Sequence, residues 1–228
     1  MSKYAEVYIV VEGKTEQTFI EKVLKPYLAQ KNIFIYATQI SKSGQKGGDV
    51  KFIRAINDIG NHLKQRADTY VCTFVDYFRI KEWPGITNVP ANATPDQIAN
   101  IVNTATKHAV AERFPELQTE RRFIPFLAIH EFEALLFSDS DILARKLGIQ
   151  VSEIERVIEQ YGIPEAINHG PDTAPSKRLE NWKKNYQKIA NGIAIAKETG
   201  IDTIRAKCFL FDAWLRKLEN LPDISDDS

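Results

Sequence analysis

The chain has 228 residues, of which 43% are hydrophobic and 26% are charged. Lys plus Arg number 30 and Asp plus Glu number 30, so the chain lacks the general positive field that favours non-specific binding of nucleic acid. Cys72 and Cys208 lack the spacing of a zinc site, and no apolar run reaches the roughly 20 residues of a membrane helix. We therefore expect a cytoplasmic globular protein with two buried thiols and no membrane span.

Hydrophobic patterning over the first 76 residues predicts the order β-α-β-α-β. Strands are expected at 6–11, 32–40 and 69–76, and helices at 15–29 and 50–65. The third strand is apolar almost throughout, which is typical of the centre of a parallel sheet covered on both faces. The sequence thus predicts an α/β fold with a Rossmann-like parallel sheet and helices on both faces.

The remaining chain adds one strand and then helices. A long excursion rich in Pro, Asn and Gly (77–95) leads to a helix from Thr94 to about Arg113, a fourth strand at 121–130 and a short helix at 131–139. Further helices are expected at 151–160, 176–190 and 201–219, before a frayed tail at 222–228. We therefore predict an α/β domain at 1–138 and a helical C-terminal subdomain at 139–228 packed on it. Core positions are expected on the last helix at Phe209, Phe211, Trp214, Leu215 and Leu218.

The segment after the first strand looks like the end of a phosphate-binding loop but lacks its first half. Gly13, Lys14 and Thr15 match the end of that loop, whereas the glycine needed five residues earlier is replaced by Tyr8. A carboxylate at Glu12 would also repel a phosphate unless a cation lay between them. The pattern points to a metal site and disfavours a small-molecule phosphotransferase.

Acidic residues follow three strands of the predicted sheet: Glu12, then Asp76, then Glu131 and Glu133. The carboxyl ends of parallel strands share one edge, where ligands bind, and carboxylate oxygens suit Mg²⁺ or Mn²⁺. If 131–133 is helical, Glu131 and Glu133 face different ways and one of them is a ligand; if it is strand, both share a face. His130 is either a general base or ligand, or a hydrogen-bonded structural residue.

Several segments carry a resemblance to a known family: VEGKTEQTF, FVDYF with WPG after it, HEFEALLFSD, APSKRL and CFLFDAWLRKLE. Over nearly the whole chain they resemble a TOPRIM-like bacterial family of unknown function, related to the TOPRIM domains of OLD-family nucleases. The resemblance implies cleavage of nucleic acid that depends on Mg²⁺ or Mn²⁺. It also implies an ABC-type or OLD-like ATPase as a partner subunit in phage defence.

Carried over by residue, Glu12 matches the TOPRIM glutamate, a proposed general acid or base, and Asp76 matches the first aspartate of the Asp-x-Asp pair. Phe78 stands in the slot of the second aspartate, so Glu131 or Glu133 would replace that ligand. The alternative is a non-catalytic TOPRIM-like regulatory or binding subunit with a degenerate site.

Basic residues near this edge are candidates for contact with phosphate. Lys14 either faces the cleft or is solvated. Ser176, Lys177 and Arg178 open a helix after Pro175, where free N–H groups and two cations suit a phosphate, although Ser176 could simply cap the helix. The loop at 41–48 is basic and suits the same role or a plain connection. The sequence does not decide between DNA and RNA as the substrate. It also leaves open whether the chain forms a homo-oligomer.

Overall fold

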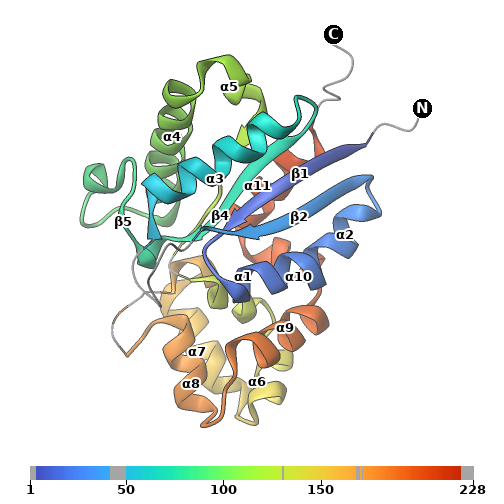
Figure 1. Ribbon diagram of the computed structural model, residues 1–228. Coiled ribbons are helices and arrows are strands. Elements are labelled where there is room, and N and C mark those ends of the chain that lie inside the picture. The colour runs from blue at the N-terminus through green and yellow to red at the C-terminus, as the bar shows by residue number, and fades with distance from the viewer. Residues whose placement is uncertain (1–3, 42–49, 130, 168–169, 171, 222–228) are drawn as a thin grey trace.

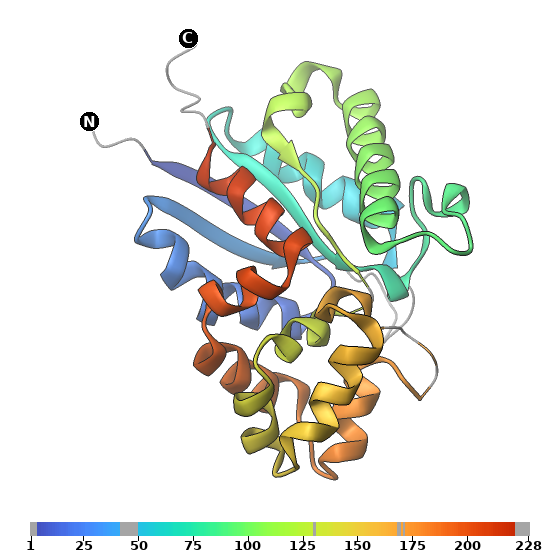
Figure 2. The same cartoon turned by 180° about the vertical axis from the view of Figure 1, so that it is seen from behind.

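The computed structural model describes residues 4–41, 50–129, 131–167, 170 and 172–221 (Figure 1). Its centre is a parallel sheet of five strands in the order β2-β1-β4-β6, with β7 also paired to β4. Helices cover both faces of the sheet, as the sequence predicts (Figures 1 and 2). The strands are β1 (Ala5–Val11), β2 (Ile33–Gln39), β4 (Tyr70–Asp76), β6 (Phe123–Ile124) and β7 (Leu127–Ala128).

Side-chain burial explains why β1 and β4 lie in the middle of the sheet. In β1, Val7 and Ile9 belong to the core on one face, and Val10 belongs to the core on the other. All seven residues of β4 are buried, because helices cover both of its faces. In the register of the two strands Val11 lies opposite Phe74, so their carboxyl ends meet at one edge of the sheet.

The first crossover is a continuous helical stretch that confirms the predicted helix at 15–29. It consists of α1 (Lys14–Phe19), the π-helical η1 (Ile20–Leu24) and α2 (Lys25–Ala29). Pro26 accounts for the irregular middle, because it has no N–H to donate to the carbonyl one turn earlier. This stretch contributes Phe19, Ile20 and Leu28 to the same core as Val7.

Two long helices cover the opposite face: α3 (Phe52–Gln65) and α4 (Pro95–Arg113). A capping box fixes the start of α4, since the Thr94 side chain accepts the Gln97 N–H and the Gln97 side chain accepts the Thr94 N–H. Both predicted helices are confirmed. The predicted start of the first at residue 50 is wrong, because β3 (Val50–Lys51) pairs with β5 (Ile80–Glu82) in a second, two-stranded sheet.

The predicted fourth strand at 121–130 is wrong in its extent. Arg121 and Arg122 belong to a helical turn, α5 (Thr119–Arg122), and only β6 and β7 pair with β4. Pro125 interrupts the strand because it cannot donate a ladder hydrogen bond. The buried Arg122 guanidinium donates to the carbonyls of Leu63, Arg66 and Thr69, and thereby ties this turn to the end of α3.

The C-terminal half is helical, as predicted, but its breaks differ. The α-helices are α6 (Ser140–Leu147), α7 (Val151–Tyr161), α8 (Pro175–Trp182), α9 (Lys188–Thr199), α10 (Ile201–Lys207) and α11 (Phe209–Glu219). Short 3₁₀ segments occur in both halves of the described chain: η2 (Tyr77–Arg79), η3 (Ile86–Asn88), η4 (Pro115–Leu117), η5 (Phe132–Ser138) and η6 (Pro164–Ala166).

Side-chain caps explain two breaks that the helical periodicity does not show. The helix predicted at 176–190 is two helices, and α9 starts where the Asn191 side chain accepts the Gln187 N–H at 2.7 Å. The helix predicted at 201–219 breaks at Cys208, because the Glu165 carboxylate accepts the N–H groups of Leu210 and Phe211, each at 2.9 Å. The sequence also missed α6, although Asp139 and Gly148 cap its ends.

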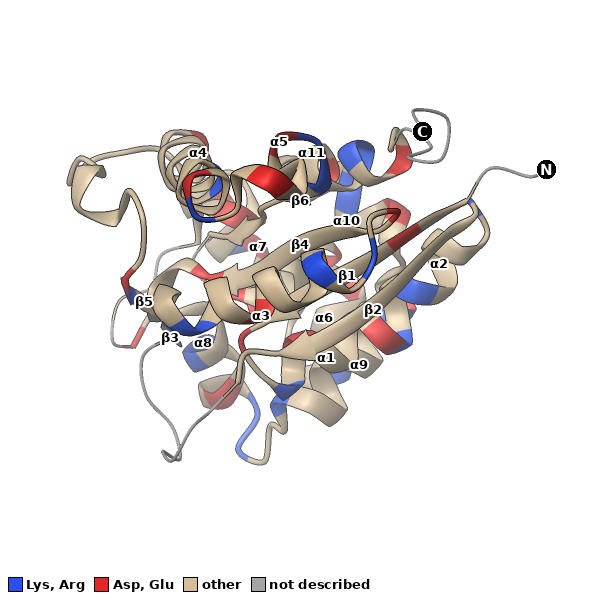
Figure 3. Cartoon of the chain, turned by 45° about the horizontal axis from the view of Figure 1, so that its top comes forward, with Lys and Arg blue, Asp and Glu red and all other residues tan. Residues whose placement is uncertain are grey.

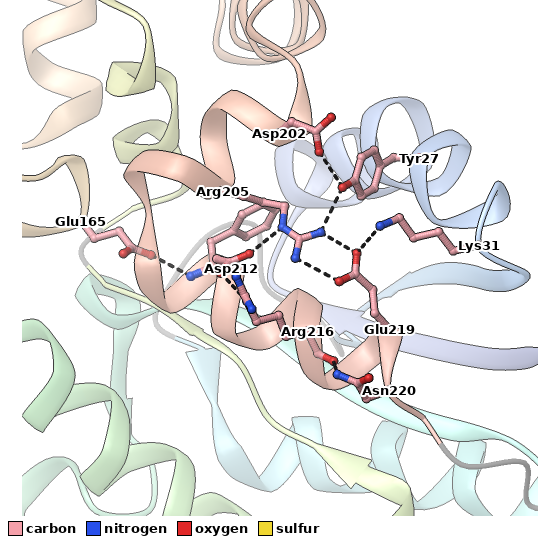
Figure 4. Close-up of polar contacts among 10 residues, drawn as sticks. Tyr27, Lys31, Glu165, Asp202, Arg205, Asp212, Arg216, Glu219 and Asn220 are labelled. Atoms are coloured by element: carbon pink, nitrogen blue, oxygen red, sulfur yellow. Dashed lines mark hydrogen bonds and ion pairs between the residues drawn. The ribbon is translucent and has the colours of Figure 1, made fainter.

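The last two helices pack on the sheet and on α2. Four of the five predicted core positions of α11 are buried, whereas Phe209 is 59% exposed. Trp214 stacks on Phe126 with ring centroids 4.8 Å apart. Arg205 donates to Tyr27 of α2 at 3.0 Å (Figure 4). The division at 138 and 139 stays a prediction, since helices from both parts share one core. Among the described helices, none has both the length and the apolar character needed to cross a bilayer.

Candidate functional site

The carboxyl ends of β1, β4 and β7 place acidic residues at one edge of the sheet. Glu12 directly follows β1, and Asp76 is the last residue of β4. Asp76 lies opposite Ala128 of β7, and Glu131 follows three residues later. His130 lies outside the described residues, so its role stays a prediction.

Asp76 is at the centre of this acidic edge. Its side chain is buried, and its Oδ1 accepts the Phe132 N–H at 3.1 Å. Burial raises its pKa well above the usual range, and the negative charges of Glu16, Glu12, Glu133 and Glu131 add to that rise. Elsewhere along the ribbon, basic and acidic residues are interspersed (Figure 3), in keeping with the 30 residues of each kind in the chain.

Glu16 belongs to the acidic edge and was missed by the sequence reasoning. It is buried in the first turn of α1, and it acts on Asp76 more strongly than the other acids do. Gly13 gives it room, because a Cβ on Gly13 would lie 3.2 Å from the Glu16 Oε2. The signal in the sequence was the spacing of four from Glu12, which places a second carboxylate one turn into the helix that follows the strand.

Glu131 bridges the acidic edge and the start of α8. Its backbone is extended, and its buried carboxylate accepts both the Ser176 N–H and the Ser176 hydroxyl at 2.9 Å. Two donors and the helix start stabilise its negative charge. The predicted anion site at Ser176 is therefore filled by Glu131 in this structure.

Glu133 lies in the first turn of η5 and is also buried. Lys188 approaches it at 3.4 Å, yet burial outweighs this cation and raises the pKa of Glu133 to about 7. Tyr186 lies nearby: burial raises the pKa of its phenol, with a further rise from Glu133, Glu180 and Glu131. Its hydroxyl is buried and has no hydrogen-bond partner within the described protein. It is therefore able to form a hydrogen bond with an oxygen atom of a bound ligand.

The predicted basic residues lie in different settings. Lys14 is exposed at the start of α1 and donates to Gln17 at 3.0 Å. Lys177 is also exposed and pairs with Glu180 at 2.7 Å. Arg178 is half-buried, donates to the Thr173 carbonyl at 2.8 Å and lies over the Tyr161 ring. Lys14 and Lys177 are therefore open to solvent, whereas Arg178 holds the loop before α8.

The acidic edge fits a divalent cation in its chemistry but is not a formed metal site. Its donors are carboxylate oxygens, the ligands that Mg²⁺ and Mn²⁺ prefer. In the described part of the chain, however, no three His, Cys, Asp or Glu side chains are placed so that they could hold one ion. Glu131 and Glu133 contact Ser176 and Lys188 instead. A bound ion would therefore require acidic side chains of this edge to turn from the positions they have here.

A cavity of about 270 Å³ opens beside Glu131. Its lining comes from η2, from the residue before η5, from the loop before α8, from α8 and from the start of α9: Phe78, Glu131, Gly170, Ala174, Ser176, Lys177, Glu180 and Lys188. A larger cavity, about 360 Å³, lies between α4 and α11 at the β6 edge, and Asp96 is its one acidic residue. The smaller cavity is the one that belongs to the acidic edge.

The fold and this edge define a parallel α/β protein with acidic residues at the carboxyl ends of its central strands, the usual place of a ligand site in such sheets. The chain belongs to the family described as "Domain of unknown function (DUF4276)", whose model matches residues 11–219. No curated protein and no solved structure matches it.

Proposed function

We propose that the chain is a divalent-metal-dependent phosphodiesterase that acts on nucleic acid at the acidic edge. The observation that supports this most is the position of Asp76, which is buried among four other carboxylates. Like charges in a region of low dielectric cost free energy that a bound cation would offset. Strongly perturbed carboxylates at a ligand-binding edge are typical of functional sites.

Each residue has a role in this proposal. With side chains of the acidic edge turned toward the ion, Glu12, Glu16 and Asp76 would hold it, with Glu131 or Glu133 as a further ligand. When bound, Mg²⁺ or Mn²⁺ lowers the pKa of a bound water and neutralises charge on the phosphate. Glu12 would transfer the proton as general acid or base, as the TOPRIM resemblance implies. Lys14 would contact the phosphate from the start of α1.

A specific observation favours a second candidate, a TOPRIM-like regulatory or binding subunit that does not cleave. Phe78 stands in the slot of the second aspartate, and Glu131 and Glu133 already have partners in Ser176 and Lys188. Without a carboxylate in that slot, the edge would hold an ion weakly or not at all.

Two further proposals accompany the function. A cytoplasmic location is supported by the buried free thiols of Cys72 and Cys208, whose pKa values are raised by burial and which are therefore inert. The ATPase partner and the role in phage defence rest on the resemblance alone and stay predictions.

The test is a cleavage assay with Mg²⁺ or Mn²⁺ on supercoiled DNA, single-stranded DNA and tRNA. We expect cleavage that EDTA abolishes and that Glu12→Gln lowers at least ~100-fold, as loss of a general acid or base does. Glu153→Gln, which changes an acid on the exposed side of α7, is the matched control and should cleave like the wild type.

The two candidates give different outcomes. Cleavage without a metal, or cleavage unchanged in Glu12→Gln, would contradict the proposed site. Absence of cleavage, together with an unfolding midpoint that Mn²⁺ does not shift, would favour the non-catalytic subunit, because an ion that binds the native state raises its stability.

A further inference from the structure

The cavity beside Glu131 is lined by one carboxylate of the acidic edge and also by an aromatic ring and two lysines. Its lining includes Glu131 and Ser176, which are both buried. Phe78, Lys177 and Lys188 also line it and are at least partly exposed. A ligand in this cavity would therefore lie next to the carboxylates proposed to bind the ion.

Phe78 gives the cavity an exposed aromatic ring. It lies in η2, directly after the strand that ends in Asp76, and 47% of it is exposed. Most large apolar side chains of the chain are buried, so an exposed ring at a cavity beside buried acids is a candidate for contact with a ligand. Nucleobases stack on such rings with little dependence on sequence.

Lys177 and Lys188 give the same cavity two cations. Lys177 pairs with Glu180 where both side chains are substantially exposed, at 50% and 36%. Such surface pairs contribute little, so Lys177 can exchange Glu180 for a phosphate at small cost. Lys188 is about one-third exposed and lies 3.4 Å from Glu133, a separation longer than a strong hydrogen-bonded pair.

We propose that this cavity binds one nucleotide of an unpaired strand, with its base against Phe78 and its phosphate toward Lys177 and Lys188. This inference rests on the proposed action on nucleic acid and narrows the substrate to single-stranded RNA or DNA. The cavity, at about 270 Å³, equals the liquid volume of roughly nine waters at about 30 Å³ each, so it has room for no more than one nucleotide unit. A duplex keeps its bases stacked inside, so it cannot offer a base face to Phe78.

The test measures binding in EDTA, where the proposed cleavage cannot occur. Fluorescence anisotropy would compare labelled 12-nucleotide oligo-U and oligo-dT with a 12-base-pair duplex. We expect tighter binding of both single strands than of the duplex, and the two single strands separate RNA from DNA preference. Phe78→Ala should weaken single-strand binding about 5- to 150-fold, the range for loss of one base stack, and Phe78→Trp should retain it.

Two matched variants complete the test. Phe209→Ala removes another exposed phenylalanine, on α11 and outside the cavity, and should bind like the wild type. Lys177→Gln should reduce the slope of log affinity against log salt by about 0.7, the value for one phosphate contact on a single strand. Circular dichroism would check that each variant is folded.

Binding and cleavage can fail separately. Single-strand affinity that is unchanged in Phe78→Ala, affinity equal to or below that for the duplex, or no binding at all would overturn the nucleotide cavity. Cleavage of duplex DNA that needs Glu12 but not Phe78 would support the phosphodiesterase and contradict this cavity. Stacking on Phe78 without metal-dependent cleavage would support the cavity and contradict the phosphodiesterase.

Discussion

Two clusters of ionisable side chains differ in how their charges are arranged. Around Arg205, cations and anions alternate: its guanidinium contacts Asp212 at 2.6 Å and Glu219 at 2.9 Å, and Lys31 contacts Glu219 at 2.7 Å (Figure 4). At the sheet edge, Asp76 instead lies among four acids. The first cluster joins α10 and α11 to α2, and the second surrounds the carboxyl ends of the central strands.

The pKa values of Glu219 and Asp76 are shifted in opposite directions by the charges around them. Burial acts to raise the pKa of Glu219, but hydrogen bonds from Arg205 and Lys31 outweigh it, and the pKa is lowered. For Asp76, burial and the neighbouring acids act in the same direction and raise the pKa. The Arg205 cluster therefore stabilises the fold in its charged form, whereas the acidic edge costs stability. A cost that the fold retains is typical of a functional site.

The largest expected effect comes from removing the central cation of the stabilising cluster. Arg205→Met leaves Asp212 and Glu219, both mostly buried, without the guanidinium, and should lower the free energy of unfolding by about 3 kcal/mol in urea denaturation. Lys31→Met is the control, because Lys31 is 42% exposed and should cost less than about 1 kcal/mol. Equal losses in the two variants would contradict the comparison.

The second prediction concerns pH, to which the two clusters should respond in opposite directions. The folded pKa of Glu133 is about 7 and its ordinary value is 4.5, so between these values the native state binds more protons than the unfolded state. This contribution is complete below pH 4.5 and is lost as pH rises through 7. Glu219, with a lowered pKa, contributes above pH 4.5 and loses its contribution as pH falls through its folded pKa.

Urea denaturation between pH 3 and 8 would measure both trends. We expect stability to fall by at least roughly 2 kcal/mol from pH 5 to pH 8, and Glu133→Gln to remove about half of that fall, because the pKa of Glu165 is raised equally. Glu165, whose pKa burial also raises to about 7, contributes in the same direction, so Glu165→Gln is the comparison variant. A flat profile between pH 5 and 8 would show that these carboxyls do not carry the cost.

The smallest effect is expected from relieving the acidic edge. Asp76→Asn removes a carboxyl group whose ionised form burial disfavours and keeps an oxygen that can accept the Phe132 N–H, so it should raise stability by about 1 kcal/mol at alkaline pH, where Asp76 loses its proton. Asp212→Asn, the same exchange in the Arg205 cluster, should lower it. Thermal unfolding midpoints that move in the same direction would remove the distinction between the clusters.

The sequence by itself determined the parallel sheet and the position of the acidic edge. The order of strands and helices over residues 6–76 can be predicted because strands and helices have different hydrophobic periodicities. Parallel topology then brings Glu12 and Asp76 to one edge without any knowledge of packing, because every strand of such a sheet ends there. The apolar neighbours of Cys72 and Cys208 in the sequence also predicted two buried thiols, which the structure confirms.

Only the tertiary structure decided the partners of the acids and the breaks in the helices. Glu131 accepts a hydrogen bond from Ser176, which lies 45 residues later in the sequence. Glu165 caps the start of α11 by accepting the N–H of Leu210, also 45 residues later. The burial of Glu16 likewise depends on what packs over α1. Periodicity describes neighbours on one element, whereas these contacts join elements whose separation in sequence leaves no local signal. For that reason the position of the acidic edge was predictable, and the state of its carboxylates was not.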